Sequence, residues 1–237
     1  MDSSIVSCAP LFSVLLTSAV IRKGKNDIAP LSFEEGVTNN INFVHIKIDP
    51  SKFSFEVLSR EQAGKLTAQE PFLLINGGYV DVNDKPCGLL VSQGQTISPF
   101  SDNHKFSAVF AINNGKAAIT RSKDFKLTEH TTFALQNGPF IIEPGKRPGI
   151  KPNATEPAER TLLALDKKGM IHFFILKGPI SLYNSQDLLL KKVKNIDAAL
   201  NLDGGPISFF KLDMLGAKGS FGHAEQPAYF IKIAPLK

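Results

Sequence analysis

The sequence predicts an α+β domain with a mixed or antiparallel β-sheet core and few helices. Of its 237 residues, 43% are hydrophobic and 21% are charged, which is ordinary for a globular protein and excludes a disordered chain. Most apolar stretches are short or alternate with polar residues, and helical signals are confined to two segments. A chain of this length fits a single large domain more easily than two small ones, and we place that domain at residues 36–237.

Alternating side chains predict two strands around a proline-marked turn at residues 41–58. Val44, Ile46 and Ile48 point one way before Asp49-Pro50, and the same alternation resumes after the turn. Two hairpins follow, at residues 106–120 around Asn113-Asn114-Gly115 and at residues 161–176 around Asp166-Lys167-Lys168-Gly169.

Helices are expected at two places. Residues 60–70 could form a short helix before Pro71. The stronger signal is at residues 185–194, where Asn184 or Ser185 serves as N-cap, an acidic residue lies early and lysines lie late, as the helix dipole favours.

Residues 1–22 are expected to be an export signal, with an N-terminal strand as the alternative. The run from Ile5 to Ile21 is mostly apolar and ends in Arg22-Lys23, although Asp2 stands where a basic residue is usual. Pro10 and several hydroxyl residues interrupt the run, so no stable membrane span is expected. The predicted location is exported, in the periplasm or cell envelope, or cytoplasmic if this segment is not a signal.

The charge of the chain favours no nucleic-acid partner. Its 27 Lys and Arg against 22 Asp and Glu give a formal charge of +5, but the basic residues are scattered and lack interleaved aromatics. We interpret them as a solvated surface whose sign suits an anionic substrate. A further interpretation is a structural interaction domain that binds its partner through this basic surface, and salt would weaken that binding.

No metal or cofactor site is indicated. The five histidines are isolated, and no zinc, P-loop, dinucleotide or EF-hand spacing is present, although a divalent ion held by carboxylates such as Asp81 remains an alternative. His45 and His172 lie within predicted strands, where a core or cross-strand role is favoured over catalysis. Cys87 is expected to be a small buried hydrophobe, because no base partner is evident.

Three apolar runs end in the same way, at a polar residue followed by glycine. They are Phe72 to Gly78, Phe133 to Pro139 and Ala198 to Gly205. Short apolar runs without alternation are typical of strands covered on both faces, and glycine lets the backbone approach a ligand closely. Asn-Gly and Asp-Gly are also common tight turns, so each run alone is compatible with a plain turn. Together the three runs predict a shared pocket, and three separate plain turns are the alternative.

These segments resemble the phosphodiester glycosidase family. Asn76-Gly77-Gly78-Tyr79-Val80-Asp81, followed by Pro86-x-Gly88-Leu89, is similar to that family's first signature. Gln136-x-Gly138-Pro139, Arg160-Thr161 and Asn201-Leu202-Asp203-Gly204-Gly205 are similar to its later elements, in the same order. The resemblance covers roughly residues 36–212. The family usually continues with another Gly where this chain has Pro206, and Tyr79-Val80 replaces a more usual aromatic pair.

The resemblance implies hydrolysis of the bond between an anomeric carbon and a phosphodiester. Arg160 is the candidate phosphate ligand, because its guanidinium fork matches two phosphate oxygens; the alternative is an ion pair with Glu156 or Glu159. Asp203 is the leading carboxylate, as nucleophile or base, and Asp81 is the second; both are also compatible with turn roles. Glu159 ranks third.

The remaining candidates would bind the substrate, which we expect to be a sugar phosphate or phosphoglycan. They are Asn76, Gly77, Gly78, Gln136, Asn137, Gly138, Asn201, Gly204 and Gly205. The asparagines could contact sugar hydroxyls or close turns, and the glycine amides could form an anion cradle. The rival interpretation is a non-catalytic carbohydrate- or polyanion-binding envelope protein, which Pro206 favours.

Overall fold

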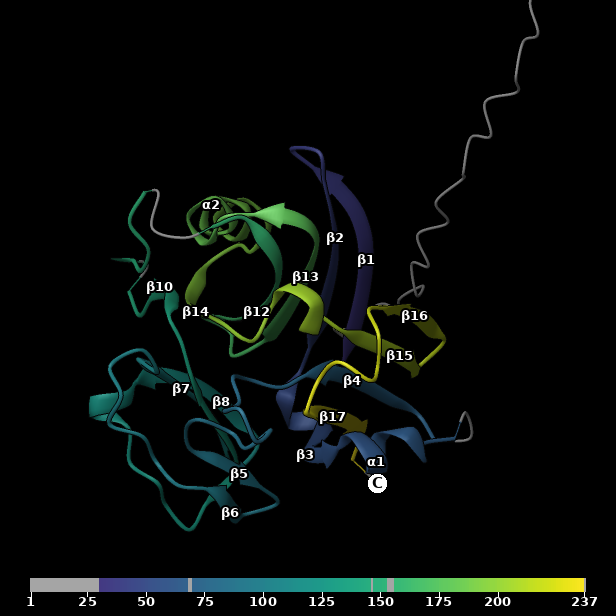
Figure 1. Cartoon of the computed structure of the whole chain (residues 1–237), viewed down its shortest axis with the longest axis vertical. Helices are drawn as coiled ribbons and strands as arrows, with labels where there is room; N and C mark the ends of the chain where they lie inside the picture. Colours follow the sequence, from purple (N-terminus) through teal and green to yellow (C-terminus); the bar gives the residue numbers. More distant parts are fainter. Residues whose placement is uncertain (1–29, 68–69, 146, 153–155, 237) are drawn as a thin grey trace, which may run out of the picture.

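The computed structural model describes residues 30–67, 70–145, 147–152 and 156–236. Most of this part is antiparallel β-sheet, and α-helix is confined to two segments (Figure 1). No helix among these residues has the length and apolar character needed to cross a bilayer. Residues 1–22, expected to be an export signal, lie outside the described part.

The strands of the described residues form three sheets. The seven-stranded sheet runs in the order β1 (Leu31–Thr38), β2 (Ile41–Ile48), β13 (Ile171–Ile180), β12 (Ala158–Asp166), β14 (Ile196–Asn201), β10 (Phe140–Glu143) and β11 (Arg147–Pro148). A five-stranded sheet runs β16 (Ala217–Phe221), β15 (Phe210–Met214), β4 (Phe72–Asn76), β17 (Tyr229–Pro235) and β3 (Phe53–Ser59). The other five-stranded sheet runs β6 (Gln95–Ser98), β5 (Leu90–Ser92), β9 (Thr131–Asn137), β7 (Ala108–Asn113) and β8 (Lys116–Arg121).

The strand predictions are confirmed. β2 and β3 flank a 3-10 turn at Pro50–Lys52, and the predicted hairpins are β7–β8 and β12–β13. Asn114 and Gly115 both have positive φ, 48° and 72°, which is the backbone of a type I′ turn. A consequence hidden from the sequence is that β2 and β3 belong to different sheets, because the proline turn redirects the chain.

The helix predictions need correction at their ends. α1 (Arg60–Gly64) is shorter than expected and has a capping box at Ser59. α2 (Leu182–Lys192) begins three residues before Ser185, so the predicted caps are wrong: the Ser181 side chain accepts from the Asn184 backbone N–H. Leu182 is buried, and starting the helix there adds its side chain to the packed face.

The main core lies among all three sheets. Its members include Ile46 of β2, Ile75 of β4 and Phe133 of β9, and each is fully buried. A second cluster includes Leu189 of α2 and Phe174 of β13, and α2 lies over the seven-stranded sheet (Figure 1). The sheets therefore close on a shared interior, and α2 covers the outer face of the largest one.

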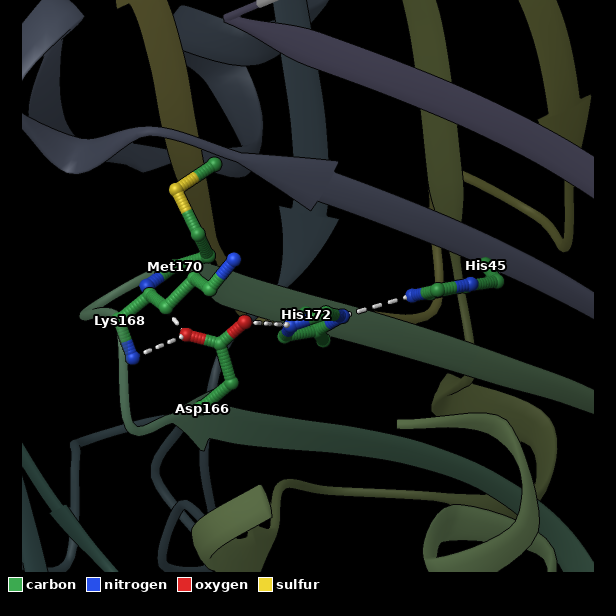
Figure 2. Close-up of polar contacts among 5 residues, drawn as sticks. All are labelled: His45, Asp166, Lys168, Met170 and His172. Carbon is green, nitrogen blue, oxygen red and sulfur yellow. Dashed lines mark hydrogen bonds and ion pairs between the residues drawn. The ribbon is translucent and has the colours of Figure 1, made fainter. Parts of the chain in front are cut away.

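A row of polar side chains crosses four neighbouring strands of the seven-stranded sheet. His45 Nε2 lies 2.9 Å from His172 Nδ1, and His172 Nε2 lies 3.3 Å from Asp166 Oδ2 (Figure 2). Because the Asp166 carboxylate accepts, His172 must carry its proton on Nε2, and His45 must donate from its own Nε2. His45 Nδ1 then faces the Glu34 carboxylate at 3.7 Å. The cross-strand role predicted for His45 and His172 is thus confirmed.

Candidate functional site

The three strands with the repeated ending converge, although each belongs to a different sheet. β4 ends at Asn76, β9 at Asn137 and β14 at Asn201, and all three asparagines are buried. Side-chain amides join these ends: Asn76 Nδ2 donates to the Asp203 carbonyl at 2.9 Å, and Asn137 Nδ2 donates to the Asn201 carbonyl at 2.8 Å. The three strand ends therefore meet, as the predicted shared pocket requires, while the pocket itself stays a prediction.

Asn76 uses every hydrogen-bonding atom of its side chain to hold this junction. Nδ2 also donates to the Gly77 carbonyl at 3.1 Å. Oδ1 accepts from the Thr161 hydroxyl at 2.7 Å and from the Phe209 backbone N–H at 3.0 Å. With no spare donor or acceptor, Asn76 is suited to holding β4 against β12 and the chain after β14 rather than to binding a sugar.

Asn201 differs because part of its side chain is unpaired. Its Nδ2 donates to the Tyr79 hydroxyl oxygen at 2.7 Å, but its buried Oδ1 has no hydrogen-bond partner in the described structure. Asn137 Oδ1 accepts from the Tyr79 backbone N–H at 3.3 Å. Tyr79 is therefore held at both its backbone and its hydroxyl, and no acceptor for its own hydroxyl hydrogen is seen among the described residues.

Gly77 and Gly78 make room for Tyr229, a residue of β17. A Cβ on Gly77 would lie 2.2 Å from the Tyr229 ring, so only glycine fits there. The Gly77 N–H donates to the Tyr229 carbonyl at 3.0 Å, and the Gly78 N–H donates to the Tyr229 hydroxyl oxygen at 2.8 Å. Both amides predicted for an anion cradle are thus occupied within the chain, which favours a structural role for this glycine pair.

Gly204 and Gly205 shape the backbone after Asp203. A Cβ on Gly204 would lie 2.7 Å from the Glu159 carbonyl oxygen and 3.7 Å from Arg160 Cδ, so the absent side chain lets this turn lie against the start of β12. The Gly204 N–H donates to Asp203 Oδ1 at 2.8 Å. Gly205 has a positive φ of 63°, which glycine adopts without strain.

Asp203 is the carboxylate with the most unusual surroundings. It is half-buried, and burial raises its pKa to about 6, while the hydrogen bond from Gly204 acts in the opposite direction. Its charge also raises the pKa of Tyr79, which burial raises first. A carboxylate that is costly to ionise in its folded environment is reactive when it does ionise, and such groups concentrate in active sites.

Arg160, at the start of β12, lies against the turn that follows Asp203, and the charges of Asp203 and Arg160 both influence the pKa of Tyr79. Its Nε donates to the Ile180 carbonyl at 3.2 Å and one terminal nitrogen donates to the Glu156 carbonyl, which leaves further N–H groups for a ligand. Burial lowers the Arg160 pKa, but a guanidinium stays charged. The ion pair with Glu156 or Glu159, our alternative reading, is not seen among the described residues.

Asp81 lies in an exposed turn near the site. Its Oδ1 accepts from the backbone N–H groups of Asn83 at 2.8 Å and Lys85 at 3.0 Å, and these bonds hold its pKa below the usual value. The charges of Asp81 and Asp203 both raise the pKa of the half-buried Cys87, after burial itself. Asp81 therefore borders the site while serving the turn; its predicted catalytic role stays a prediction.

Gln136 and Gly138 hold a neighbouring loop, residues 99–107. Gln136 Oε1 accepts from the Leu89 and Ser101 backbone N–H groups at 3.0 and 2.9 Å, and Nε2 donates to the Ser101 carbonyl at 2.7 Å. A Cβ on Gly138 would lie 2.2 Å from the Lys105 carbonyl oxygen. The motif that we expected to touch substrate directly thus anchors the wall beside the site.

Sequence reasoning missed two tyrosines. Tyr79 was visible only as the aromatic position of the first motif, yet the charges of Asp203 and Arg160 both influence its pKa and its ring lies 6.2 Å from the Phe106 ring. Tyr229 gave no local signal, because it lies 151 residues from the glycine that it contacts and beyond the resemblance.

No group of three or more His, Cys, Asp or Glu residues gathers closely enough to hold a metal ion in the described ranges. The groups with spare bonding capacity at this site are instead a carboxylate, a guanidinium, a phenol and an amide oxygen. Such a set can bind an anion and activate or replace a water molecule.

Comparison with known proteins gives a consistent picture. The family model for phosphodiester glycosidase matches residues 72–225. YigE of Escherichia coli K12, an uncharacterized protein, is 29% identical over 140 residues, which make up 56% of this chain and 55% of that protein; the match thus spans about half of its length.

Two solved structures share the fold. The zebrafish N-acetylglucosamine-1-phosphodiester alpha-N-acetylglucosaminidase catalytic domain, auto-inhibited by its pro-peptide, superposes with a TM-score of 0.61 and 14% identity, covering 87% of this chain and 82% of that one. A hypothetical protein from Synechocystis gives a TM-score of 0.64 and 14% identity, covering 87% and 62%. The family match over most of the described residues agrees with the motif order found in the sequence, and the chain belongs to the phosphodiester glycosidase family.

Proposed function

We propose that the chain hydrolyses the glycosidic bond of a sugar-1-phosphodiester, with Asp203 and Arg160 as its catalytic pair and residues 36–237 as one catalytic domain. The observation that carries the proposal is the half-buried Asp203 carboxylate, with its pKa raised to about 6, in a turn that lies against Arg160, whose guanidinium has unpaired N–H groups. Family membership supports the reaction class.

In the proposed reaction the phosphate lies at Arg160 and the anomeric carbon faces Asp203. An oxygen nucleophile forms a bond to that carbon, and the bond from the carbon to the phosphate oxygen breaks. Its electron pair leaves on the phosphate, which is a good leaving group and needs no strong general acid. Asp203 acts either as base, taking the proton of an attacking water, or as the nucleophile itself.

Tyr79 would assist this step through its free hydroxyl hydrogen. The Asn201 amide occupies one lone pair of its oxygen, so the hydrogen is directed elsewhere, and Asp203 and Arg160 both influence its pKa. A donor fixed at this point could bond a phosphate or sugar oxygen as charge builds in the transition state. Asn201 Oδ1, buried and unpaired, is the matching acceptor for a sugar hydroxyl.

The test is hydrolysis of a panel of sugar-1-phosphodiesters by purified protein. We expect release of free sugar, loss of about 10³-fold in kcat/KM for Asp203→Asn and at least tenfold for Arg160→Lys, which keeps the charge but loses the fork. Arg60→Lys, on α1, is the matched control and should keep full activity.

The outcome that defeats the proposal is absence of turnover on every panel member. Retained binding of sugar phosphates would then support the non-catalytic carbohydrate-binding alternative. Pro206, which favoured that alternative in the sequence, is exposed and lies in the 3-10 turn at Gly205–Ile207. Export, with the periplasm or envelope as the site of action, stays a prediction from residues 1–22.

A further inference from the structure

The polar row of the seven-stranded sheet consists of Glu34, His45, His172 and Asp166, and it takes no part in the proposed hydrolysis. Its members come from β1, β2, β13 and β12, which are neighbours in that order. Three contacts join them: Glu34 Oε2 to His45 Nδ1 at 3.7 Å, His45 Nε2 to His172 Nδ1 at 2.9 Å, and His172 Nε2 to Asp166 Oδ2 at 3.3 Å. The row is open to solvent at one end, because the Glu34 side chain is 52% exposed, and closed at the other, where Asp166 is 6% exposed.

The buried end of the row fixes the direction of its hydrogen bonds. Asp166 Oδ1 accepts from the backbone N–H groups of Lys168 at 2.8 Å and Met170 at 3.0 Å, which holds the carboxylate with Oδ2 toward His172 (Figure 2). A carboxylate only accepts, so the hydrogen of this contact lies on His172 Nε2. The bare His172 Nδ1 must then accept from His45 Nε2.

At neutral pH the row therefore has one contact more than it has hydrogens. Each neutral histidine carries one ring hydrogen, and both of these are already used in the two inner contacts. The outer contact has the bare Nδ1 of His45 on one side and the Glu34 carboxylate on the other. Two acceptors thus face each other at the solvent end of the row.

We propose that the polar row is a binding site for one proton, which enters at His45 Nδ1 and ties the edge strand β1 to the sheet. The proton comes from solvent, and the new N–H group points at Glu34, so each of the three contacts then holds one hydrogen. The hydrogen between the rings can stay on His45 Nε2 or cross to His172 Nδ1, so the two rings share the charge. Neither ring has to rotate, and no hydrogen bond of the row is lost.

A second proton has no place in the row. It would put two N–H groups against each other across the 2.9 Å between His45 and His172, and two charged rings whose centroids are 5.2 Å apart would repel each other. Burial and then the charge of His172 lower the pKa of His45 to about 3, which agrees with a second proton that enters only in strong acid.

The surroundings place the first proton in mild acid. Burial lowers the pKa of His172, Asp166 raises it, and Lys47, its partner across the β2–β13 pair, lowers it. Burial also lowers the pKa of His45, and Lys192 of α2 and Lys47 act in the same direction. The first proton is therefore taken up below pH 6.5, the ordinary pKa of histidine, and the row is empty at neutral pH.

Uptake of this proton changes how β1 is held. Glu34 lies directly opposite His45 in the β1–β2 register, and β1 is an edge strand of its sheet. At neutral pH the Glu34 carboxylate is held by Lys192 of α2, with Nζ at 3.3 Å from Oε1. In mild acid it also accepts from the charged imidazole, and such bonds are stronger than those between neutral groups. Because edge strands open locally, the added bond should be visible as slower opening of β1.

The first experiment follows the imidazole nitrogens of the full chain by ¹⁵N NMR from pH 7.5 to pH 3.5. We expect both rings to carry their hydrogen on Nε2 at pH 7.5, and both to respond together at one midpoint below pH 6.5 as a single proton enters. A hydrogen on Nδ1 of either ring at pH 7.5 would overturn the hydrogen count. Separate midpoints, with both rings fully charged at pH 4.5 in the folded protein, would overturn the one-proton site.

Two exposed variants test the role of Glu34. Glu34→Gln removes the carboxylate beside Nδ1 and should weaken proton binding by the row about threefold or more. Glu35→Gln is the matched control, because Glu35 is the next residue of β1 but pairs with Lys177, and it should leave the midpoint unchanged. An unchanged midpoint in Glu34→Gln would overturn His45 Nδ1 as the point of entry.

Hydrogen exchange of backbone amides tests the consequence for β1. Buried neutral histidines lose stability for the whole fold as the pH falls below 6.5, so protection in β1 is compared with protection in the core strand β14. We expect this ratio to rise about threefold through the midpoint in the wild type and in Glu35→Gln, but not in Glu34→Gln. A ratio that stays constant in the wild type would overturn the tie between the proton and β1.

Discussion

Replacing Asp203 with asparagine should make the protein more stable while removing the proposed hydrolytic activity. The Asp203 pKa is raised from 3.8 to about 6, so the folded state binds its proton more tightly than the unfolded state. The resulting stability is fully present below pH 3.8 and is lost as the pH rises through about 6. Above that pH the wild type carries a charge that its surroundings disfavour, whereas an amide carries none.

The expected gain in stability of Asp203→Asn follows from the shift in the Asp203 pKa. Two pKa units correspond to about 3 kcal/mol, and because Asp203 is only half-buried, solvent screening reduces the effect to about 1–2 kcal/mol at pH 7.5. Urea unfolding of wild type and Asp203→Asn at pH 7.5 and pH 4 measures it, and the gap should vanish at the lower pH. Asp197→Asn, on β14, is the matched control.

The proposed activity should increase as Asp203 ionises, whereas stability decreases. Asp203 acts as a carboxylate in either proposed role, so wild-type kcat/KM should rise with pH through about 6 and then level off. A variant that is less stable than wild type at pH 7.5, or a stability gap that does not change with pH, would refute this account. Full activity in Asp203→Asn would refute its chemical role.

Three further predictions concern the scaffold. Gly77→Ala should destabilise by at least about 2 kcal/mol in urea unfolding, because its Cβ would collide with Tyr229, whereas Gly64→Ala, with nothing within 4 Å, should not. Gln136→Ala should lower the free energy of unfolding by about 2–3 kcal/mol, since it leaves the Leu89 and Ser101 N–H groups unpaired. An unchanged urea midpoint would contradict the role of Gln136 in holding the loop. Burial lowers the pKa of His45 to about 3, so acidification from pH 6.5 to 5 should cost about 2 kcal/mol, and His45→Gln should reduce that loss.

The sequence predicted the strands well because their signals are local. The apolar runs ending at Asn76, Asn137 and Asn201 are buried strands, as the lack of alternation indicated. Sheet membership was not predictable, because it depends on pairing between distant segments. β2 and β3 are separated by one proline turn, yet they pair in different sheets. The start of α2 was missed because Ser181, Asn184 and Ser185 are all capable caps, and burial of Leu182 decides among them.

At the site, the resemblance pointed to segments that meet in the fold but could not separate the tasks of their residues. The turn that follows Asp203 lies against Arg160, and four short motifs in order allowed us to expect that these segments meet. Asn76 and Gln136 use their side chains to hold neighbouring segments together. Their partners, such as Thr161 and Ser101, lie on other strands and loops, so this role could not be seen in the sequence. Tyr229 was not predictable at all, since nothing near it in the sequence refers to Gly77.

The division between holders and reactive groups is itself an argument for a functional site. A polar side chain that bridges buried strands is destabilising unless each of its atoms is paired, and Asn76 meets that condition. Within the site, the unpaired capacity lies instead at Asn201 Oδ1, the Tyr79 hydroxyl, Arg160 and Asp203. A fold selected for stability alone would pair or remove these groups, whereas a binding site must leave them unpaired for its ligand. Substitutions should therefore separate into two classes, with changes to the holders lowering stability and changes to the unpaired groups lowering turnover.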